Sequence, residues 1–165
     1  MSSWPLSADG LRAMYQGGRA NKAARRFARL WAAVFGWGLS SKRWVTLEVP
    51  GRKSGRVTRF PLGMARVDGR WYLVSMLSED CHWVKNVRAN AGNATIRHGR
   101  SMACQLIEVP PEDRAPIIKS YLTQVPGARP QIPVDRQSAV ADFESITARY
   151  PVFRVAKLSP ARPGI

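Results

Sequence analysis

The sequence predicts a small, mainly β barrel with peripheral helices, and three observations carry that prediction. Six apolar segments of strand length recur between residues 44 and 158, most of them joined by hairpin signals such as Asp68-Gly69. Helical patterns fall before, between and after these segments. The 165 residues suffice for one domain with a core of its own, and six Trp argue against disorder.

The N-terminal part is expected to comprise a loose leader, residues 1–18, and a basic amphipathic helix, residues 19–39. Its basic and apolar faces lie about 140° apart at 100° per residue. The helix either packs on the barrel with its basic face in water or lies on an anionic membrane. Its apolar run of about ten residues is too short to span a bilayer. The basic face consists of Lys22, Arg25, Arg26 and Arg29, and the apolar face of Phe27, Leu30, Trp31 and Val34.

Residues 40–160 are expected to form the barrel itself. Pro61 should occupy an edge strand or a bulge, because proline cannot donate to a sheet ladder. A short helix should begin at Ser78-Glu79-Asp80, which offers N-cap side chains, and end near Ala89. The predicted strands of this part are Trp44–Val49, Val57–Val67, Arg70–Leu77, Asn93–Arg97 and Met102–Val109.

The C-terminal part alternates helix, loop, helix and strand. A helix is predicted from Pro111, a residue suited to the first turn, to about Thr123. A proline-rich loop, Pro126–Pro133, should separate it from a second helix at Asp135–Ala148. Val152–Leu158 should form the last strand.

The charge of the chain requires an acidic partner. Lys and Arg number 26 and Asp and Glu 11, a net charge of +15. Nucleic acid, an anionic membrane and an acidic cofactor all satisfy this requirement. Nucleic acid is disfavoured because the basic residues belong to no recognisable binding module.

One basic turn concentrates positive charge between two predicted strands. Pro50–Arg56 reads Pro-Gly-Arg-Lys-Ser-Gly-Arg, and Arg59 follows it. Glycine permits positive φ, so backbone N–H groups can converge on one point, and the side chains add charge there. The turn therefore indicates a phosphate site, although an ordinary hairpin turn with solvated charges is the alternative.

The order of motifs resembles the deazaflavin-dependent nitroreductase family, split β-barrel oxidoreductases of the FMN-binding type that use coenzyme F420. The resemblance covers residues 44–109 and continues more weakly beyond them. It rests on Gly51-Arg52-Lys53-Ser54-Gly55, Pro61-Leu62, Asp68-Gly69 and the segment Trp83-Val84-Lys85-Asn86-Val87-Arg88-Ala89-Asn90.

The resemblance implies a set of cofactor-binding residues. The phosphate end of F420 would contact the basic turn, the strand after the turn would pass beside the cofactor, and a strand end and a helix would enclose the deazaflavin ring. The phosphate contacts would be Arg52, Lys53 and Ser54, with Arg56, Thr58 and Arg59 nearby, and the strand beside the cofactor would be Phe60, Pro61 and Leu62. The ring would meet backbone groups of Val74, Ser75 and Met76 on one side and Trp83, Asn86, Val87 and Arg88 on the other. Trp83 and Asn86 could instead serve only as core and cap residues of a short helix.

The implied reaction is hydride transfer from reduced F420 to a quinone-like or nitroaromatic acceptor. The cofactor supplies the chemistry and the protein orients it. The candidate proton donors are Ser75, Tyr150 and water. Two alternatives stay open: a non-catalytic lipid- or haem-binding protein on the same barrel, kept open by the short loop at residues 78–82, and an FMN-dependent oxidase.

The cysteines carry no further chemistry. Cys81 adjoins His82, but two adjacent residues make a poor metal site or nucleophile pair. With only two Cys the expected compartment is the cytoplasm. Residues 19–39 could hold the protein on the inner face of the cell membrane, and a homodimer is left open.

Overall fold

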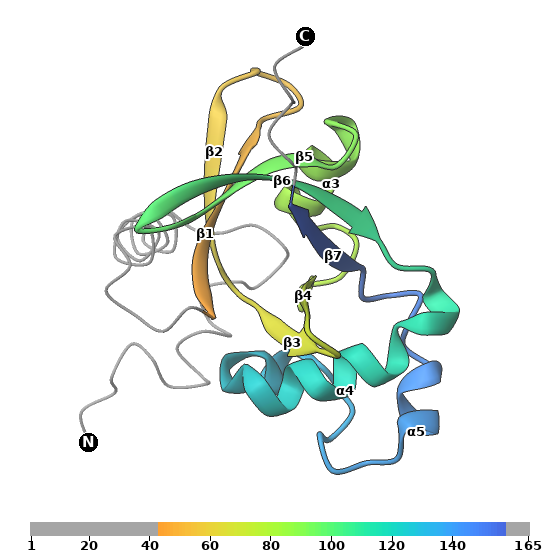
Figure 1. Ribbon diagram of the computed structural model, residues 1–165. Helices are drawn as coiled ribbons and strands as arrows, with labels where there is room; N and C mark the ends of the chain where they lie inside the picture. Colours follow the sequence, from red (N-terminus) through yellow and green to blue (C-terminus); the bar gives the residue numbers. More distant parts are fainter. Residues whose placement is uncertain (1–42, 158–165) are drawn as a thin grey trace, which may run out of the picture.

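The computed structural model of the chain describes residues 43–157. The expected leader and basic helix of residues 1–39 lie outside the described residues. The described part forms one antiparallel sheet of seven strands in the order β2-β1-β5-β6-β7-β4-β3 (Figure 1). The strands are β1 Trp44–Pro50, β2 Val57–Gly63, β3 Ala65–Val67, β4 Arg70–Val74, β5 Asn93–His98, β6 Arg100–Glu108 and β7 Val152–Lys157.

The sheet curls into a half-barrel because its two edge strands are consecutive in the chain. β2 and β3 lie at opposite ends of the strand order, yet Met64 alone connects them. The sheet must bend until its edges approach each other, since one residue spans less than 4 Å. Met64 is buried and donates its N–H to the carbonyl of Arg43 at 2.7 Å. The mainly β half-barrel confirms the predicted fold class.

Strand alternation produces two separate cores. Val45, Leu47 and Val49 of β1 point into the half-barrel, where they pack with Trp83 and Phe153. The second core lies between the sheet and the helices of the C-terminal half. It contains Tyr72, Val74, Ile118, Tyr121, Leu122, Phe143 and Val152.

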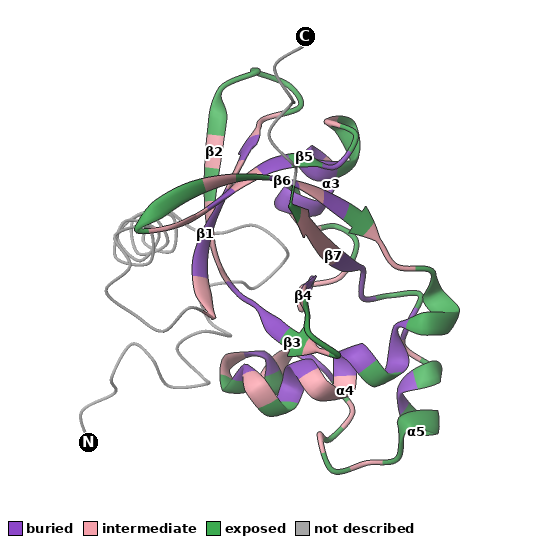
Figure 2. Ribbon diagram, in the orientation of Figure 1, coloured by how far each residue is buried: buried purple, intermediate pink, exposed green. Residues whose placement is uncertain are grey.

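Within residues 43–157, five helical segments cover the sheet and its ends. α3, His82–Ala89, closes the half-barrel, while α4, Ala115–Gln124, packs along its other side together with α5, Val140–Glu144 (Figure 1). Figure 2 shows the side of α4 toward the sheet as buried. Two short 3₁₀ helices, η2 at Pro111–Asp113 and η3 at Pro126–Gln131, flank α4.

Two strand predictions were wrong in their extent. The expected strand Val57–Val67 is broken at Met64, because its two halves belong to opposite edges of the sheet. The strand expected at Arg70–Leu77 ends at Val74, because the chain turns at Ser78, whose φ is +76°. The edge position expected for Pro61 is confirmed, and so is the turn at Asp68-Gly69, where both φ angles are positive.

The helix predictions also need correction. α3 begins after Cys81 with no side-chain cap, and Asp80 pairs with Lys85 instead. The expected loop Pro126–Pro133 contains the 3₁₀ helix η3. The helix expected at Asp135–Ala148 shrinks to the five residues of α5. Beyond Glu144 the chain continues as turns, in which the N–H of Ile146 donates to the Phe143 carbonyl and the N–H of Arg149 to the Ile146 carbonyl, so the i→i−4 ladder of the helix stops.

Candidate functional site

The basic turn between β1 and β2 is built on its two glycines. The N–H of Gly51 donates to the carbonyl of Arg56 at 2.8 Å, and the N–H of Gly55 donates to the carbonyl of Gly51 at 2.8 Å. Gly55 has a φ of +67°, which favours glycine at this position. These bonds close the turn and leave Arg52, Lys53 and Ser54 at its tip. Figure 2 shows the turn as exposed.

Asn86 of α3 holds this turn from beneath. Its Oδ1 accepts hydrogen bonds from the backbone N–H of Arg52 at 3.2 Å and from Arg52 Nη1 at 3.0 Å. Its Nδ2 donates to Thr58 Oγ1 at 3.3 Å, and the Thr58 hydroxyl donates to the Val49 carbonyl at 2.6 Å. Asn86 is 4% exposed. The turn and the Trp-x-x-Asn helix are thus joined by side-chain hydrogen bonds.

The turn retains two consecutive backbone donors for a ligand. The N–H groups at positions 51, 52, 55 and 56 have partners within the protein, the last at Ser54 Oγ. The N–H groups of Lys53 and Ser54 have no partner among the described residues. The Ser54 hydroxyl accepts from Arg56 and keeps its own hydrogen to donate. Successive free N–H groups form an anion-binding concavity.

The charge at the turn suits the same ligand class. Within residues 43–157, Lys53 and Arg56 form no ion pair, and both are exposed. Arg52 keeps guanidinium N–H groups beyond the one given to Asn86. Lysine and arginine beside free backbone N–H groups can hold the phosphate of an acidic cofactor.

The strand residues expected beside the cofactor lie on two different faces of β2. Phe60 and Leu62 pack against the core of the half-barrel, and Thr58 lies on the same side. Arg59 and Pro61 alternate to the opposite face, where Arg59 Nε donates to Glu48 at 2.9 Å. One ligand cannot contact all five side chains from one side.

The residues expected around the deazaflavin ring are largely interior. Trp83 and Val87 are buried in the half-barrel core, and the Trp83 ring lies 5.4 Å from that of Phe153. Val74 is buried and Met76 is half-buried against the second core. These side chains belong to the two cores and would support a ring site from within the protein.

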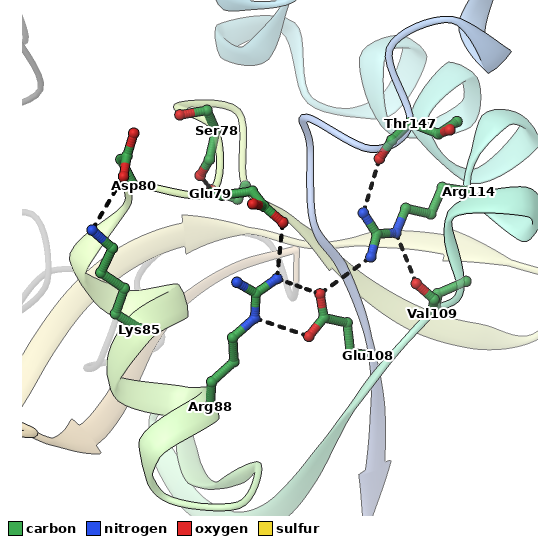
Figure 3. Close-up of polar contacts among 10 residues, drawn as sticks. Ser78, Glu79, Asp80, Lys85, Arg88, Glu108, Val109, Arg114 and Thr147 are labelled. Atoms are coloured by element: carbon green, nitrogen blue, oxygen red, sulfur yellow. Dashed lines mark hydrogen bonds and ion pairs between the residues drawn. The ribbon is translucent and has the colours of Figure 1, made fainter.

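Arg88 lies in a cluster of ion pairs directed away from the turn. It donates to Glu108 at 2.6 Å and to Glu79 at 3.2 Å, and Glu108 also accepts from Arg114 at 3.1 Å (Figure 3). The hydrogen bond to Glu108 raises the pKa of Arg88. Burial lowers the pKa of Arg114, which also donates to the carbonyls of Val109 and Thr147.

The hydroxyls of both candidate proton donors are engaged with backbone carbonyls, although Ser75 lies beside the chain next to Tyr150, where its N–H donates to the carbonyl of Pro151 at 2.9 Å. Ser75 is fully buried, and its hydroxyl donates to the carbonyl of Ser78 at 2.7 Å. The hydroxyl of Tyr150 donates to the carbonyl of Gln131 at 3.2 Å. Burial raises the pKa of the Cys81 thiol, so Cys81 lacks the thiolate character of a nucleophile. Residues 43–157 contain no group of three His, Cys, Asp or Glu suited to a metal ion.

Sequence reasoning missed two features that geometry supplies. It did not predict the two hydrogen bonds that Asn86 accepts from Arg52. It also missed Glu108 and Arg114, since nothing in the sequence pairs two groups that meet only after β6 and α4 have packed. No helix within the described range is long and apolar enough to cross a membrane.

Comparisons with known proteins give this geometry a family context. Residues 21–142 match the model of a family described as F420H(2)-dependent quinone reductase. No curated protein matches the sequence.

Several solved structures are similar to this chain. An F420-H2 dependent reductase, FDR-A, has 23% identity over 69% of this chain and 94% of its own, with a TM-score of 0.46. A conserved hypothetical protein from Mycobacterium tuberculosis has 15% identity over 77% of this chain and 80% of its own, with a TM-score of 0.52. A protein of unknown function from Agrobacterium tumefaciens has 14% identity over 76% of this chain and 53% of its own, with a TM-score of 0.51. The last two likenesses concern the fold alone, and the first, with a TM-score of 0.46, supports neither fold nor function.

Proposed function

The chain belongs to the F420H2-dependent quinone reductase family, and from that premise we propose that it transfers hydride from reduced F420 to a quinone-like acceptor. The wider activity, F420-dependent oxidoreduction, follows from the family. The quinone-like acceptor agrees with the family's name, and a nitroaromatic acceptor is the second candidate.

The observation that carries the proposal is the hydrogen-bonded pair of Arg52 and Asn86. It joins the basic turn of residues 50–56 to the Trp-x-x-Asn helix, although Arg52 and Asn86 are 34 residues apart in the sequence. The turn presents the free N–H groups of Lys53 and Ser54 together with the Lys53 and Arg56 side chains. This donor set fits the phosphodiester of F420.

The protein's contribution is binding and orientation. F420, when bound, supplies the hydride chemistry. Lys53, Ser54 and Arg56 would hold its phosphate, with Arg52 fixed beside them by Asn86. Phe60 and Leu62 would border the cofactor from β2. Water is the proton source best supported, because the hydroxyls of Ser75 and Tyr150 both donate to backbone carbonyls.

The test is fluorescence titration of F420 against the double variant Lys53→Ala/Arg56→Ala. Loss of two charge-assisted contacts should weaken F420 binding by about 2–4 kcal/mol, roughly 30- to 1,000-fold. Stability should hardly change, because both side chains are exposed. The matched control is Arg66→Ala/Arg70→Ala on the β3–β4 hairpin, which removes the same charge. Equal losses of F420 affinity in the two double variants would show that the turn contributes only nonspecific positive charge.

Turnover separates the proposed enzyme from its alternatives. Oxidation of F420H2 by menadione supports the quinone reductase, and faster oxidation by a nitroaromatic compound would favour the second acceptor. Retention of haem or fatty acid without F420 binding would replace the enzyme by a carrier. A yellow protein as purified would indicate FMN.

Membrane contact by residues 19–39 is a separate prediction. The full chain should co-sediment with anionic liposomes, and a form that lacks residues 1–39 should stay in the supernatant. Equal partitioning of both forms would remove the membrane from the proposal. The mass of the protein in solution, measured without liposomes, tests the homodimer.

A further inference from the structure

A cavity lies at the helical end of the molecule. It has a volume of about 530 Å³ and is lined by residues 129–136 together with Leu122, Arg149 and Tyr150. These segments belong to α4, η3 and the chain before β7. In Figure 1 that end of the molecule lies opposite the β1–β2 turn. The cavity is therefore separate from the proposed phosphate site.

Two of its three guanidinium groups are free to receive a ligand. Arg129 is committed to the protein, since it donates to the carbonyls of Leu122 and Thr123. Arg136 is half-buried and makes no hydrogen bond or ion pair with any residue in the described range. Arg149 has its guanidinium carbon 5.8 Å from the centre of the Tyr150 ring. A guanidinium stacked on a ring keeps its in-plane N–H groups available for an acceptor.

The rest of the lining mixes apolar side chains with Gln131 and one carboxylate, Asp135. Leu122 and Ile132 are buried, Val134 is half-buried, and the Tyr150 ring is covered by Arg149. Asp135 accepts a hydrogen bond from the N–H of Gln137 and forms no ion pair with a described residue. Its charge opposes a dianion such as a phosphate monoester about twice as strongly as a monoanion.

We propose that this cavity binds a small organic carboxylate with an apolar body. Arg136 and Arg149 hold the carboxylate, which matches the planar fork of a guanidinium. The hydrocarbon part lies against Pro133 and Val134, the more exposed apolar residues of the lining. The volume is in the range of sites for such molecules, about 300–1,000 Å³. This site is independent of hydride transfer and of the F420 turn.

The test uses 4-phenylbutyrate as the probe, titrated by calorimetry into the full chain. The neutral 4-phenylbutyramide and the dianionic 3-phenylpropyl phosphate serve as comparison ligands. We expect the carboxylate to bind at least tenfold more tightly than either. Arg136→Gln should weaken it about tenfold, and Arg149→Gln likewise. Arg70→Gln, an exposed arginine outside the lining, should leave it unchanged.

Several outcomes would overturn the site. They are absence of phenylbutyrate binding at millimolar concentration, equal binding of the amide, and wild-type affinity in Arg136→Gln. Tighter binding of 3-phenylpropyl phosphate than of 4-phenylbutyrate would show that the cavity prefers phosphate monoesters to carboxylates. If Arg149→Gln unfolds because its ring contact is lost, Arg136→Gln decides alone, since Arg136 makes no hydrogen bond or ion pair with a described residue. Lys53→Ala/Arg56→Ala should keep phenylbutyrate affinity, so the two sites fail or succeed separately.

Discussion

At the scale of single residues, Asn86 is the side chain on which the candidate site depends. It is buried, and three of its hydrogen bonds go to Arg52 and Thr58. Its amide group supplies an acceptor and a donor in one plane, which few side chains do. Asn86 therefore positions the turn, whereas Lys53, Ser54 and Arg56 are the proposed ligand contacts.

Replacing Asn86 by Ala should weaken F420 binding about tenfold and lower stability by about 1–3 kcal/mol. The reason is that the N–H of Arg52 and the Thr58 hydroxyl each lose a buried partner. Fluorescence titration and urea unfolding measure the two effects. Asn90→Ala is the control, because Asn90 ends the same helix and its amide donates to Asn93 at the exposed surface. Wild-type F420 affinity in Asn86→Ala would contradict a positioning role.

The proton source can be tested at Ser75 and Tyr150. Ser75→Ala and Tyr150→Phe should each keep kcat with F420H2 and menadione within about threefold if water supplies the proton. A general acid contributes about 10²- to 10⁴-fold, so a loss of that size in either variant would identify the donor. The dependence of kcat on pH, measured for both variants, distinguishes a lost acid from a shifted structure.

At the scale of elements, the connection from α3 to β5 determines where the helix of the site ends. Gly92 has a φ of +80° and donates its N–H to the Val87 carbonyl at 2.9 Å. A Cβ at this position would meet the carbonyl oxygen of Leu106 on β6. Two independent requirements, positive φ and space, therefore select glycine.

Gly92→Ala should cost about 3 kcal/mol or more, because backbone strain and the contact with Leu106 add together. Gly69→Ala has a similar φ of +76° but open space around the added Cβ, so it should cost only about 1–2 kcal/mol. Chemical unfolding of the two variants isolates the steric part. Equal costs would show that the β6 backbone moves away freely.

At the scale of the whole molecule, two devices hold distant segments together. The Met64 connection joins both edges of the sheet and curls it. The cluster of Glu79, Arg88, Glu108 and Arg114 ties α3, β6 and α4 to each other, and Arg114 reaches Thr147 before β7 (Figure 3). Only 5% of the Arg114 side chain is exposed.

Glu108→Gln should destabilise the protein by about 2–3 kcal/mol, because it leaves the buried Arg114 without its carboxylate. Thermal unfolding at constant pH measures the loss. Asp80→Asn removes a carboxylate from an exposed pair with Lys85 and should change stability by less than about 1 kcal/mol. A neutral result for Glu108→Gln would mean that the carbonyls of Val109 and Thr147 suffice for Arg114.

The sequence by itself determined the half-barrel class, the edge position of Pro61, the Asp68-Gly69 turn and the basic turn of residues 50–56. These features depend on local chemistry: apolar alternation, glycine φ and charge. The helix ends and strand lengths predicted from the sequence were wrong where tertiary packing set them, as at the strand break at Met64 and the end of α5 at Glu144.

The tertiary structure alone decided which residues of the candidate site meet. It joined Asn86 to Arg52, divided the β2 residues between two faces, placed Arg88 with Glu108 and opened the cavity beside Tyr150. The physical reason is that such contacts span tens of residues in the chain. They form only when strand register and helix packing bring the groups within hydrogen-bond distance.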